Sequence, residues 1–281
     1  MEKVKKIRND PKLFIYEIRK IKRDLYFWGI ATFIVLMIFV FICRKDASVF
    51  LTLSSMTQAL SFIIIFLKVI NFQNCSGISV NSLIIFNEIF ICRILIIIFF
   101  SSDLSLELIN YAFYFLSNFA SISVCCYLLY LIYYEYPETS DIMIDNKIPH
   151  YYLSIPSFFL AIIFKPYIFQ NWFADLLWIY SIFLECIAVY PQIILFTNKN
   201  GQIESFTAHF IAFQGLSTIF NILFWVKNFY GLNDSDSLLL GGFSGYLVII
   251  SELVQLIIIG YFIYLYFQSL LKIKNKKKYD I

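Results

Sequence analysis

The chain has 281 residues, of which 60% are hydrophobic and only 15% are charged, with a formal net charge of +3. No soluble fold of this length needs so much apolar surface, and repeated apolar stretches of about 20 residues are typical of membrane spans. The composition therefore excludes an ordinary soluble enzyme or binding domain. The six cysteines are scattered and lack the paired spacing of a disulfide framework or a zinc site.

The first apolar run covers residues 25–43 and follows a segment that holds nine Lys or Arg residues. Its core is long enough to cross a bilayer, and no clear small-residue cleavage site follows it. We interpret this run as a retained transmembrane helix. A cleaved signal peptide is the alternative interpretation.

Seven more apolar runs follow along the chain. They cover residues 49–70, 80–100, 108–133, 151–168, 172–196, 206–226 and 238–267. Backbone groups in hydrocarbon must be satisfied within their own segment, so these runs are predicted to be helices. The run 151–168 is the weakest because Lys165-Pro166 interrupts it. The sequence thus predicts an all-α, polytopic membrane protein with about eight transmembrane helices.

Basic residues predict the orientation of these helices. Besides the basic amino-terminal segment, five lysines lie between Lys272 and Lys278. The positive-inside rule then places both termini in the cytosol, which requires an even number of crossings and agrees with eight. The loops that this assigns to the cytosol are 71–79, 134–150 and 197–205. The loops that it assigns to the luminal side are 44–48, 101–107, 169–171 and 227–237.

The apolar runs contain both signs of charge at bilayer depth, Glu185 and Arg93. An intramembrane charge indicates a functional site by default. The planar guanidinium of Arg93 can hold a carboxylate through two hydrogen bonds and cannot lose its proton. Glu88 lies about 140° away around the same helix, so we expect Arg93 to pair with another helix or with a ligand. A permanent Arg93–Glu185 bridge that only joins helices is the alternative.

Two sequence blocks carry a resemblance to a known family. The first block is LKVINFQNCSGIS (67–79), and the second runs from Trp178 to Gly215. The matching residues are Lys68, Cys75, Gly77, Ile78 and Ser79, followed by Trp178, Ser181, Ile182, Leu184, Glu185, Ala188, Pro191 and Gln192. Through these residues the chain resembles the KDEL receptor family, the ER lumen protein-retaining receptors, over roughly residues 47–273.

The resemblance implies a particular fold and division of the chain. It implies a seven-helix core of two three-helix bundles and a linking helix, similar to the SWEET and PQ-loop families, with Pro191 and Gln192 as the proline–glutamine element. Residues 1–46 would form a basic cytosolic segment and one extra helix. Residues 47–270 would form the receptor-like membrane domain, and 271–281 a basic cytosolic tail.

The resemblance also implies a function. Such receptors bind the Lys/His-Asp-Glu-Leu carboxyl terminus of luminal proteins, tightly at acidic Golgi pH and weakly in the ER, and return these proteins to the ER. The expected location is the ER and Golgi membranes. The expected partners are this carboxyl-terminal tetrapeptide, the lipid bilayer and, through the lysine-rich tail, vesicle coat machinery. A tail that only sets topology and binds anionic lipid is the alternative. We expect no cofactor, no metal and no nucleic acid.

The peptide site that the resemblance implies is centred on Arg93, which would hold the terminal carboxylate. Glu185 and Asp175 stand where the family has two glutamates facing its cavity, and Trp225 matches a tryptophan that could stack on a basic side chain. Burial disfavours the charged form of Glu185, which could therefore take up a proton between ER and Golgi pH. The alternatives are a neutral helix contact for Glu185 and a lipid-interface anchor for Trp225. The full set of expected peptide-binding residues is Arg93, Asp175, Glu185, Trp225, Gln58, Ser217 and Asn221.

Several positions depart from the pattern of the family. Gln58 replaces the pH-sensing histidine, and Leu51 replaces an arginine near the cavity. A tyrosine–arginine pair falls on Ser217 and Thr218, and a further tyrosine and arginine fall on Asn221 and Asn228. Conversely, Glu252 stands where the family is small and neutral. Because His150 and His209 lie at predicted cytosolic ends of helices, any response to luminal pH must come from Glu185, Asp175 or Glu252.

Two other functions fit the same residues. One is a PQ-loop or SWEET-like transporter of a small polar solute, which requires a cavity that opens alternately to both sides. The other is a paralogue that has lost signal binding and acts by association with a true receptor. We find no His–carboxylate–nucleophile set or metal-spaced cluster that indicates catalysis.

Overall fold

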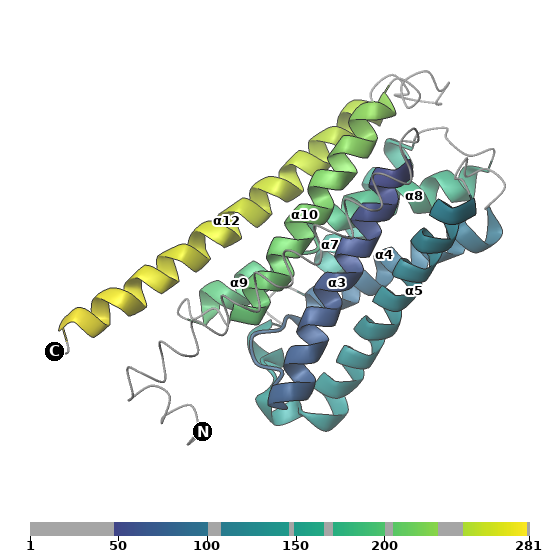
Figure 1. Cartoon of the computed structure of the whole chain (residues 1–281). Helices are drawn as coiled ribbons and strands as arrows, with labels where there is room; N and C mark the ends of the chain where they lie inside the picture. The colour runs from purple at the N-terminus through teal and green to yellow at the C-terminus, as the bar shows by residue number, and fades with distance from the viewer. Residues whose placement is uncertain are drawn as a thin grey trace. The chain divides into compact units, whose positions relative to one another are not determined.

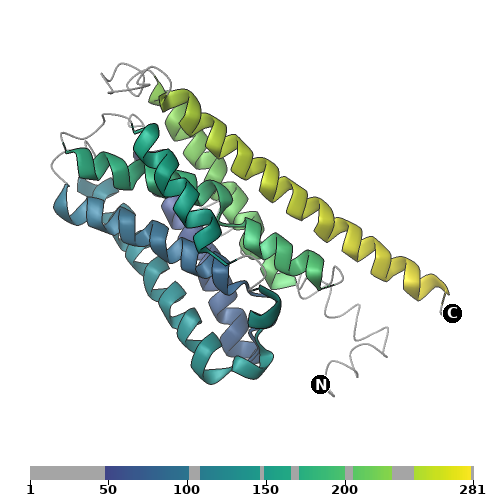
Figure 2. The same ribbon diagram turned by 180° about the vertical axis from the view of Figure 1, so that it is seen from behind.

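The computed structural model describes residues 48–100, 108–145, 149–165, 171–199, 205–229 and 244–279. The chain divides into two units, Met1–Val49 and Phe50–Ile281, and nearly all of the described residues belong to the second. The predicted helix 25–43 and the predicted amino-terminal region 1–46 lie outside the described residues. In the described ranges every regular element is a helix (Figures 1 and 2).

The seven predicted runs after the first all form helices. The long ones are α3 (Ser48–Phe72), α4 (Val80–Phe99), α5 (Leu108–Tyr130), α8 (Trp172–Ile187) followed by α9 (Tyr190–Asn198), α10 (Ser205–Lys227) and α12 (Ser244–Tyr279). A π-helical turn (Leu131–Glu135) extends α5, and a 3₁₀ turn (Pro137–Thr139), α6 (Ile142–Asp145) and α7 (Tyr151–Ile163) follow.

Six segments of the described chain are long and apolar enough to cross a bilayer: Ser48–Phe72, Val80–Phe99, Ile109–Glu135, Trp172–Asn198, Phe206–Lys227 and Gly245–Gln268. Large apolar side chains, among them Phe99, Phe119 and Ile257, stand exposed on the outside of these helices. Such a surface is suited to lipid because acyl chains do not penalise apolar exposure. The prediction of a polytopic, all-helical membrane protein is confirmed. The grouping into two three-helix bundles and a linker stays a prediction of the resemblance.

The helix predicted over 151–168 is shorter than expected. It ends at Ile163, with Phe164 as its carboxyl-terminal cap. Pro166 explains the early end, because the residue before a proline is disfavoured in helical geometry and the proline itself has no N–H to donate. The 13-residue helix α7 packs against α8 and also contains Pro156.

The run predicted over 172–196 is broken into α8 and α9. The first helix ends at Ile187, and the second begins at Tyr190 with Pro191 in its first turn. The proline removes one backbone donor and its ring clashes with the preceding turn, so the helix cannot continue through it. The break leaves Gln192 at the start of α9, where its side chain reaches the loop between α3 and α4.

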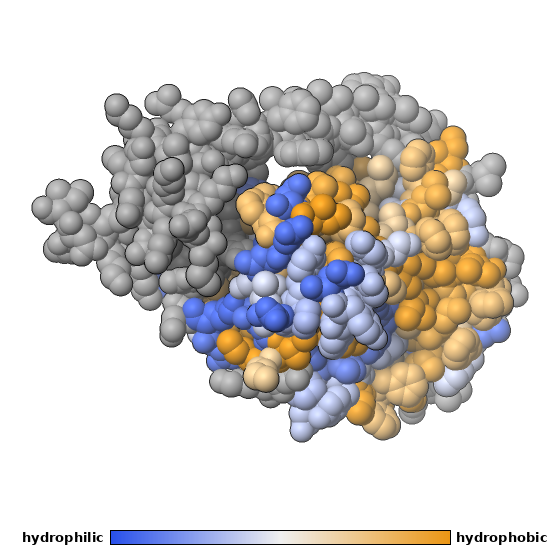
Figure 3. Space-filling view, turned by 90° about the horizontal axis from the view of Figure 1, so that it is seen from below, coloured by the Kyte–Doolittle hydropathy of each residue, from blue (hydrophilic) through white to orange (hydrophobic). Residues whose placement is uncertain are grey.

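Polar contacts hold the loop between α3 and α4. This loop lies at the helix ends that the positive-inside rule assigns to the cytosol. The side chain of Gln192 accepts a hydrogen bond from the backbone N–H of Ser79 at 2.8 Å and donates to the carbonyl of Gly77 at 2.7 Å. Gly77 has a φ of +79°, a conformation that favours glycine. Its N–H donates to Asp141, which also pairs with Lys199. Seen end-on, hydrophilic residues gather on this face beside a hydrophobic flank (Figure 3).

Aromatic packing and close helix approach hold the rest of the core. The ring of Phe62 makes edge contacts with Phe86, Phe90 and Phe210, and so joins α3, α4 and α10. The neighbouring helices α10 and α12 lie side by side in both views (Figures 1 and 2). A Cβ atom on Gly215 would lie 3.0 Å from a methyl carbon of Ile259, so this crossing leaves little room for a side chain at residue 215.

Candidate peptide-binding site

A buried ion pair between α4 and α8 forms the centre of the candidate site. The Nη2 of Arg93 contacts the Oε2 of Glu185, and the two residues are 7% and 1% exposed. Glu88, on the same helix as Arg93, instead accepts a hydrogen bond from the Tyr180 hydroxyl at 3.0 Å. Arg93 thus pairs with a separate helix, as the helical geometry predicts. Both charges face inward, because neither could be left in lipid without a partner.

Gln58 of α3 links the two members of the ion pair. Its Oε1 accepts a hydrogen bond from Arg93 Nη1 at 3.0 Å, and its Nε2 donates to Glu185 Oε1 at 2.9 Å. The same Nε2 lies 3.3 Å from the side-chain oxygen of Gln214. An amide can satisfy an arginine and a carboxylate at once because it carries both an acceptor and donors. Gln58 therefore joins α3, α4, α8 and α10 at one point.

A line of small polar side chains extends from Gln58 along α3. Ser61 accepts a hydrogen bond from Gln214 Nε2 at 2.7 Å. In the other direction, Ser54 and Ser217 share a hydrogen bond of 2.8 Å. Hydrogen bonds between helices satisfy polar groups that hydrocarbon cannot satisfy. Ser217, an expected peptide-binding residue, is therefore a helix–helix contact in this structure.

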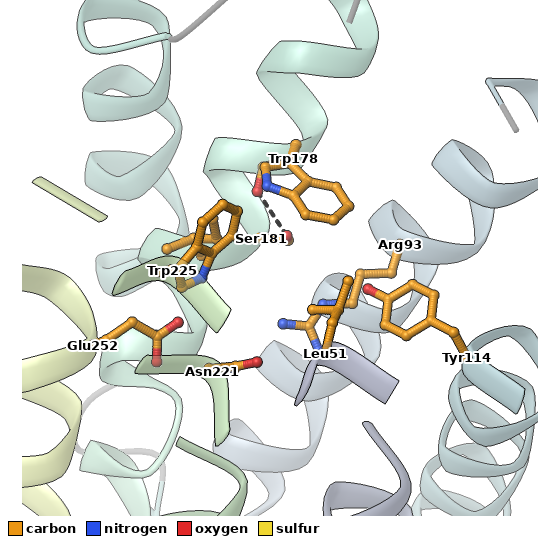
Figure 4. Close-up of a pocket in the computed structure, with 9 residues that line it drawn as sticks. Leu51, Arg93, Tyr114, Trp178, Ser181, Asn221, Trp225 and Glu252 are labelled. Carbon is orange, nitrogen blue, oxygen red and sulfur yellow. Dashed lines mark hydrogen bonds between the residues drawn. The ribbon is translucent and has the colours of Figure 1, made fainter. Parts of the chain in front are cut away.

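A small cavity lies beside the ion pair, within roughly two to three turns of the helix ends that the charges assign to the lumen. Its lining residues are Leu51, Arg93, Tyr114, Trp178, Ser181, Ile182, Asn221, Trp225 and Glu252. The guanidinium of Arg93 points into it from one side and the carboxyl of Glu252 from the other, with Asn221 between them (Figure 4). The cavity has space for about one water molecule. A peptide end would have to widen it.

Glu252 is the second acid of this cavity. It is 2% exposed, and its Oε2 has no hydrogen-bond partner among the described residues. The groups that act on its charge are Glu185, Arg93 and the indole of Trp225. The ring of Trp225 packs edge-on against Trp178 at a centroid distance of 6.1 Å. Trp225 is 4% exposed, so it is a wall of the cavity and not a lipid-interface anchor.

Asp175 lies apart from these residues. It is completely buried near the start of α8, and its carboxylate lies 3.6 Å from the Nζ of Lys165. Lys165 also lies over the ring of Trp172, 5.9 Å from the centroid. Asp175 does not line the cavity in this structure. Its partner comes from the turn after α7, which the sequence identifies only as a helix end.

Sequence reasoning did not single out Tyr114 of α5. This residue is 1% exposed and lines the cavity together with Arg93. A signal was present, because Asn110, Tyr114, Asn118 and Ser121 are spaced three to four residues apart and form one polar stripe on an apolar helix. The nitrogen of the Asn118 side chain donates to the carbonyl of Tyr114 at 2.7 Å.

The arrangement is suited to binding an anion. A guanidinium has five N–H donors, and the described hydrogen bonds of Arg93 use one to Gln58 and one to Glu185. The remaining donors can hold a second carboxylate from the cavity side. Of the expected site residues, Arg93, Asn221 and Trp225 line the cavity, while Gln58 and Glu185 lie behind Arg93 and hold its guanidinium in position.

The sequence is similar to those of known receptors. The family model described as ER lumen protein retaining receptor matches residues 74–228. ER lumen protein-retaining receptor 3 of Mus musculus is 28% identical over 233 residues, which cover 81% of this chain and 96% of the relative. Receptor 2 of Homo sapiens is also 28% identical, with 81% and 97% covered. Receptor 3 of Danio rerio is 29% identical over 218 residues, with 77% and 91% covered.

Proposed function

Because the chain belongs to the ER lumen protein-retaining receptor family, we propose that it binds the carboxyl-terminal retention signals of luminal proteins. It would return these proteins from the Golgi to the ER as a multi-pass protein of both membranes. The observation that carries the proposal is Arg93, a buried cation that faces a cavity and has hydrogen-bond donors beyond those used in the described part of the chain. The free carboxylate of a peptide end is the group that such a cation recognises best.

The other cavity residues support a peptide ligand with both signs of charge. Asn221 can donate to the terminal carboxylate or accept from a backbone N–H of the signal. Trp225 provides an aromatic face on which a basic side chain of the signal can stack. A KDEL or HDEL end carries a basic residue three positions before its carboxylate. Arg93 and Trp225 thus suit the terminal carboxylate and the basic side chain of such a signal.

We propose the orientation that the basic residues indicate. With both termini in the cytosol, the cavity lies near the luminal ends of α3, α4, α8, α10 and α12, where a luminal signal can enter. The lysines from Lys272 to Lys278 then lie in the cytosol, where they can contact vesicle coat proteins or anionic lipid headgroups.

Peptide binding by the purified full-length protein tests the proposal. Peptides ending in KDEL or HDEL, with a free or an amidated carboxyl end, are titrated at about pH 5.5 and about pH 7.4. We expect tighter binding at acidic pH, loss on amidation and loss in Arg93→Ala. Arg93→Lys is the matched control, because it keeps the charge but not the two-pronged geometry and should bind with intermediate affinity.

Two other outcomes would point to other functions. Equal binding of the free and amidated peptides, together with solute flux in liposomes, would indicate a transporter of the PQ-loop or SWEET type. Failure of the wild-type protein to bind any peptide at either pH would indicate a paralogue that acts by association. Either result would refute the receptor proposal.

A further inference from the structure

Glu252 is a buried acid without a counter-ion of its own. It lies inside the last span, Gly245–Gln268, and its Oε2 receives no hydrogen bond from the described residues. Arg93 is the cation that acts on it, but Arg93 already contacts the carboxylate of Glu185. A buried carboxylate is stable in its charged form only when it is paired. The charged form of Glu252 is therefore unfavourable in this site.

The charges that surround Glu252 can be counted from every helix packed against α12 or facing it across the cavity. Helix α8 contributes Glu185 and the neutral thiol of Cys186, and α4 contributes Arg93. Helix α10 contributes the uncharged indole of Trp225, and α5 contributes the neutral phenol of Tyr114. With all three ionisable charges present, one cation faces two carboxylates, and the site carries a net charge of −1. Addition of a peptide carboxylate would make it −2.

We propose that Glu252 controls the entry of the peptide carboxylate: the end of the signal joins Arg93 only when a proton has neutralised Glu252. This inference rests on the proposed function of the cavity. It assigns the acid response to a residue that faces Arg93 across the site (Figure 4). With Glu252 neutral, Arg93 and Glu185 balance each other, and an added carboxylate leaves a net charge of −1 in place of −2. Gln58, which lies between Arg93 and Glu185, has no proton to exchange at these pH values.

The sign of the pH dependence follows directly. At acidic pH Glu252 is protonated and peptide binding is stronger. At higher pH Glu252 is deprotonated and peptide binding is weaker. If one proton is taken up for each peptide, the dissociation constant changes by up to about tenfold per pH unit. The amino acid at residue 252 would then decide at which pH the signal is released.

The experiment compares wild-type protein with two variants that are neutral at every pH, Glu252→Gln and Glu252→Met. Glu88→Gln is the matched control, because Glu88 is a partly buried acid in a span but lies outside the cavity lining and accepts from Tyr180. A peptide ending in KDEL is titrated by calorimetry at about pH 5.5 and about pH 7.4, in buffers with different heats of ionisation. The difference between buffers gives the number of protons taken up per peptide.

We expect about one proton per peptide in the wild-type protein and in Glu88→Gln. Both Glu252 variants should take up none, and at neutral pH they should bind as tightly as the wild type does in acid. Unchanged proton uptake in both Glu252 variants would overturn the proposal. Weaker binding at both pH values would also overturn it, because Glu252 would then be a contact for the basic residue of the signal.

An infrared measurement without peptide separates this inference from the proposed function. The stretching band of a protonated carboxyl should grow between about pH 7.4 and about pH 5.5 in the wild type and in Glu88→Gln, and not in Glu252→Gln. If the wild type binds no peptide, the receptor function fails, and the infrared band still decides whether Glu252 titrates. An acid-induced band that persists unchanged in Glu252→Gln would show that Glu252 is not the carboxyl that takes up the proton.

Discussion

Replacement of Arg93 with alanine should destabilise the folded protein even in the absence of peptide. The substitution removes the contact with Glu185 and the 3.0 Å hydrogen bond to Gln58. Glu185, which is 1% exposed, then keeps only the hydrogen bond from Gln58 Nε2. It must either hold an unpaired charge in the interior or take up a proton.

The size of this effect follows from what is known of buried ion pairs. Removal of one partner costs about 3–5 kcal/mol, because the other charge remains buried without compensation. Replacement of both partners by neutral groups of similar size is often close to neutral. We therefore expect Arg93→Ala to lower Tm by on the order of 10 °C. The double variant Arg93→Leu with Glu185→Gln should lie within about 2 kcal/mol of the wild type, since the new amide can still accept from Gln58.

Thermal unfolding in detergent measures stability, and peptide titration measures binding in the same samples. The double variant should be stable and yet unable to bind a peptide with a free carboxyl end. That separation distinguishes a binding cation from a bridge that only joins helices. The reasoning is refuted if Arg93→Ala unfolds at the wild-type temperature, or if the stable double variant binds the free and amidated peptides as the wild type does.

Three further predictions concern other parts of the molecule. Gly215→Ala places a methyl group against Ile259 and should lower stability by about 1–3 kcal/mol in thermal unfolding. The same substitution should cost less in an Ile259→Ala background than in the wild type, and an unaffected single variant would contradict the close approach. Burial raises the pKa of Asp145 against the hydrogen bonds from Ser79 and Asn81, so stability should fall as pH rises from about 4 through the raised pKa. Asp145→Asn should flatten that part of a plot of Tm against pH, and an unchanged slope would count against the assignment. The side chain introduced by Gln58→His has one donor and one acceptor when it is neutral. It can therefore replace the contacts of Gln58 with Glu185 and Arg93. Protonation would remove the acceptor and with it the contact to Arg93. In calorimetry the variant should take up more protons per peptide than the wild type. An equal number of protons would refute this prediction.

Much of the helical frame could be predicted from the sequence because lipid imposes one rule on every span. A run such as 206–226 has to be helical when its backbone is surrounded by hydrocarbon, and the structure has a helix over Ser205–Lys227. The angular position of Glu88 relative to Arg93 likewise depends only on helix geometry. These inferences are local: they need a single helix and no knowledge of which helices are neighbours.

The parts that could not be predicted depend on contacts between segments distant in the chain. Asp175 and Lys165 are joined across a turn whose path the sequence does not specify, so the cavity-facing role expected for Asp175 has no support in its contacts. Gln192 is recognisable as part of a motif, but its two hydrogen bonds to the loop at Gly77 and Ser79 require the break before α9. The polar stripe that contains Tyr114 can be read from the sequence, but the residues that it faces depend on the packing of α5 against α4.

Three departures from the family pattern affect the charge of the cavity. Leu51 lines the cavity where the resemblance implies an arginine, and Gln58 stands beside Arg93 where it implies a histidine. Both changes remove positive charge, while Glu252 adds a negative charge to the opposite wall. A carboxylate ligand therefore depends on Arg93 alone and meets an acid that the resemblance does not place there. An anion can enter such a site only if a negative charge is removed first, and a proton is the available means. Gln58 removes the family's histidine, and Glu252 supplies in its place the proposed proton site for acid-dependent binding.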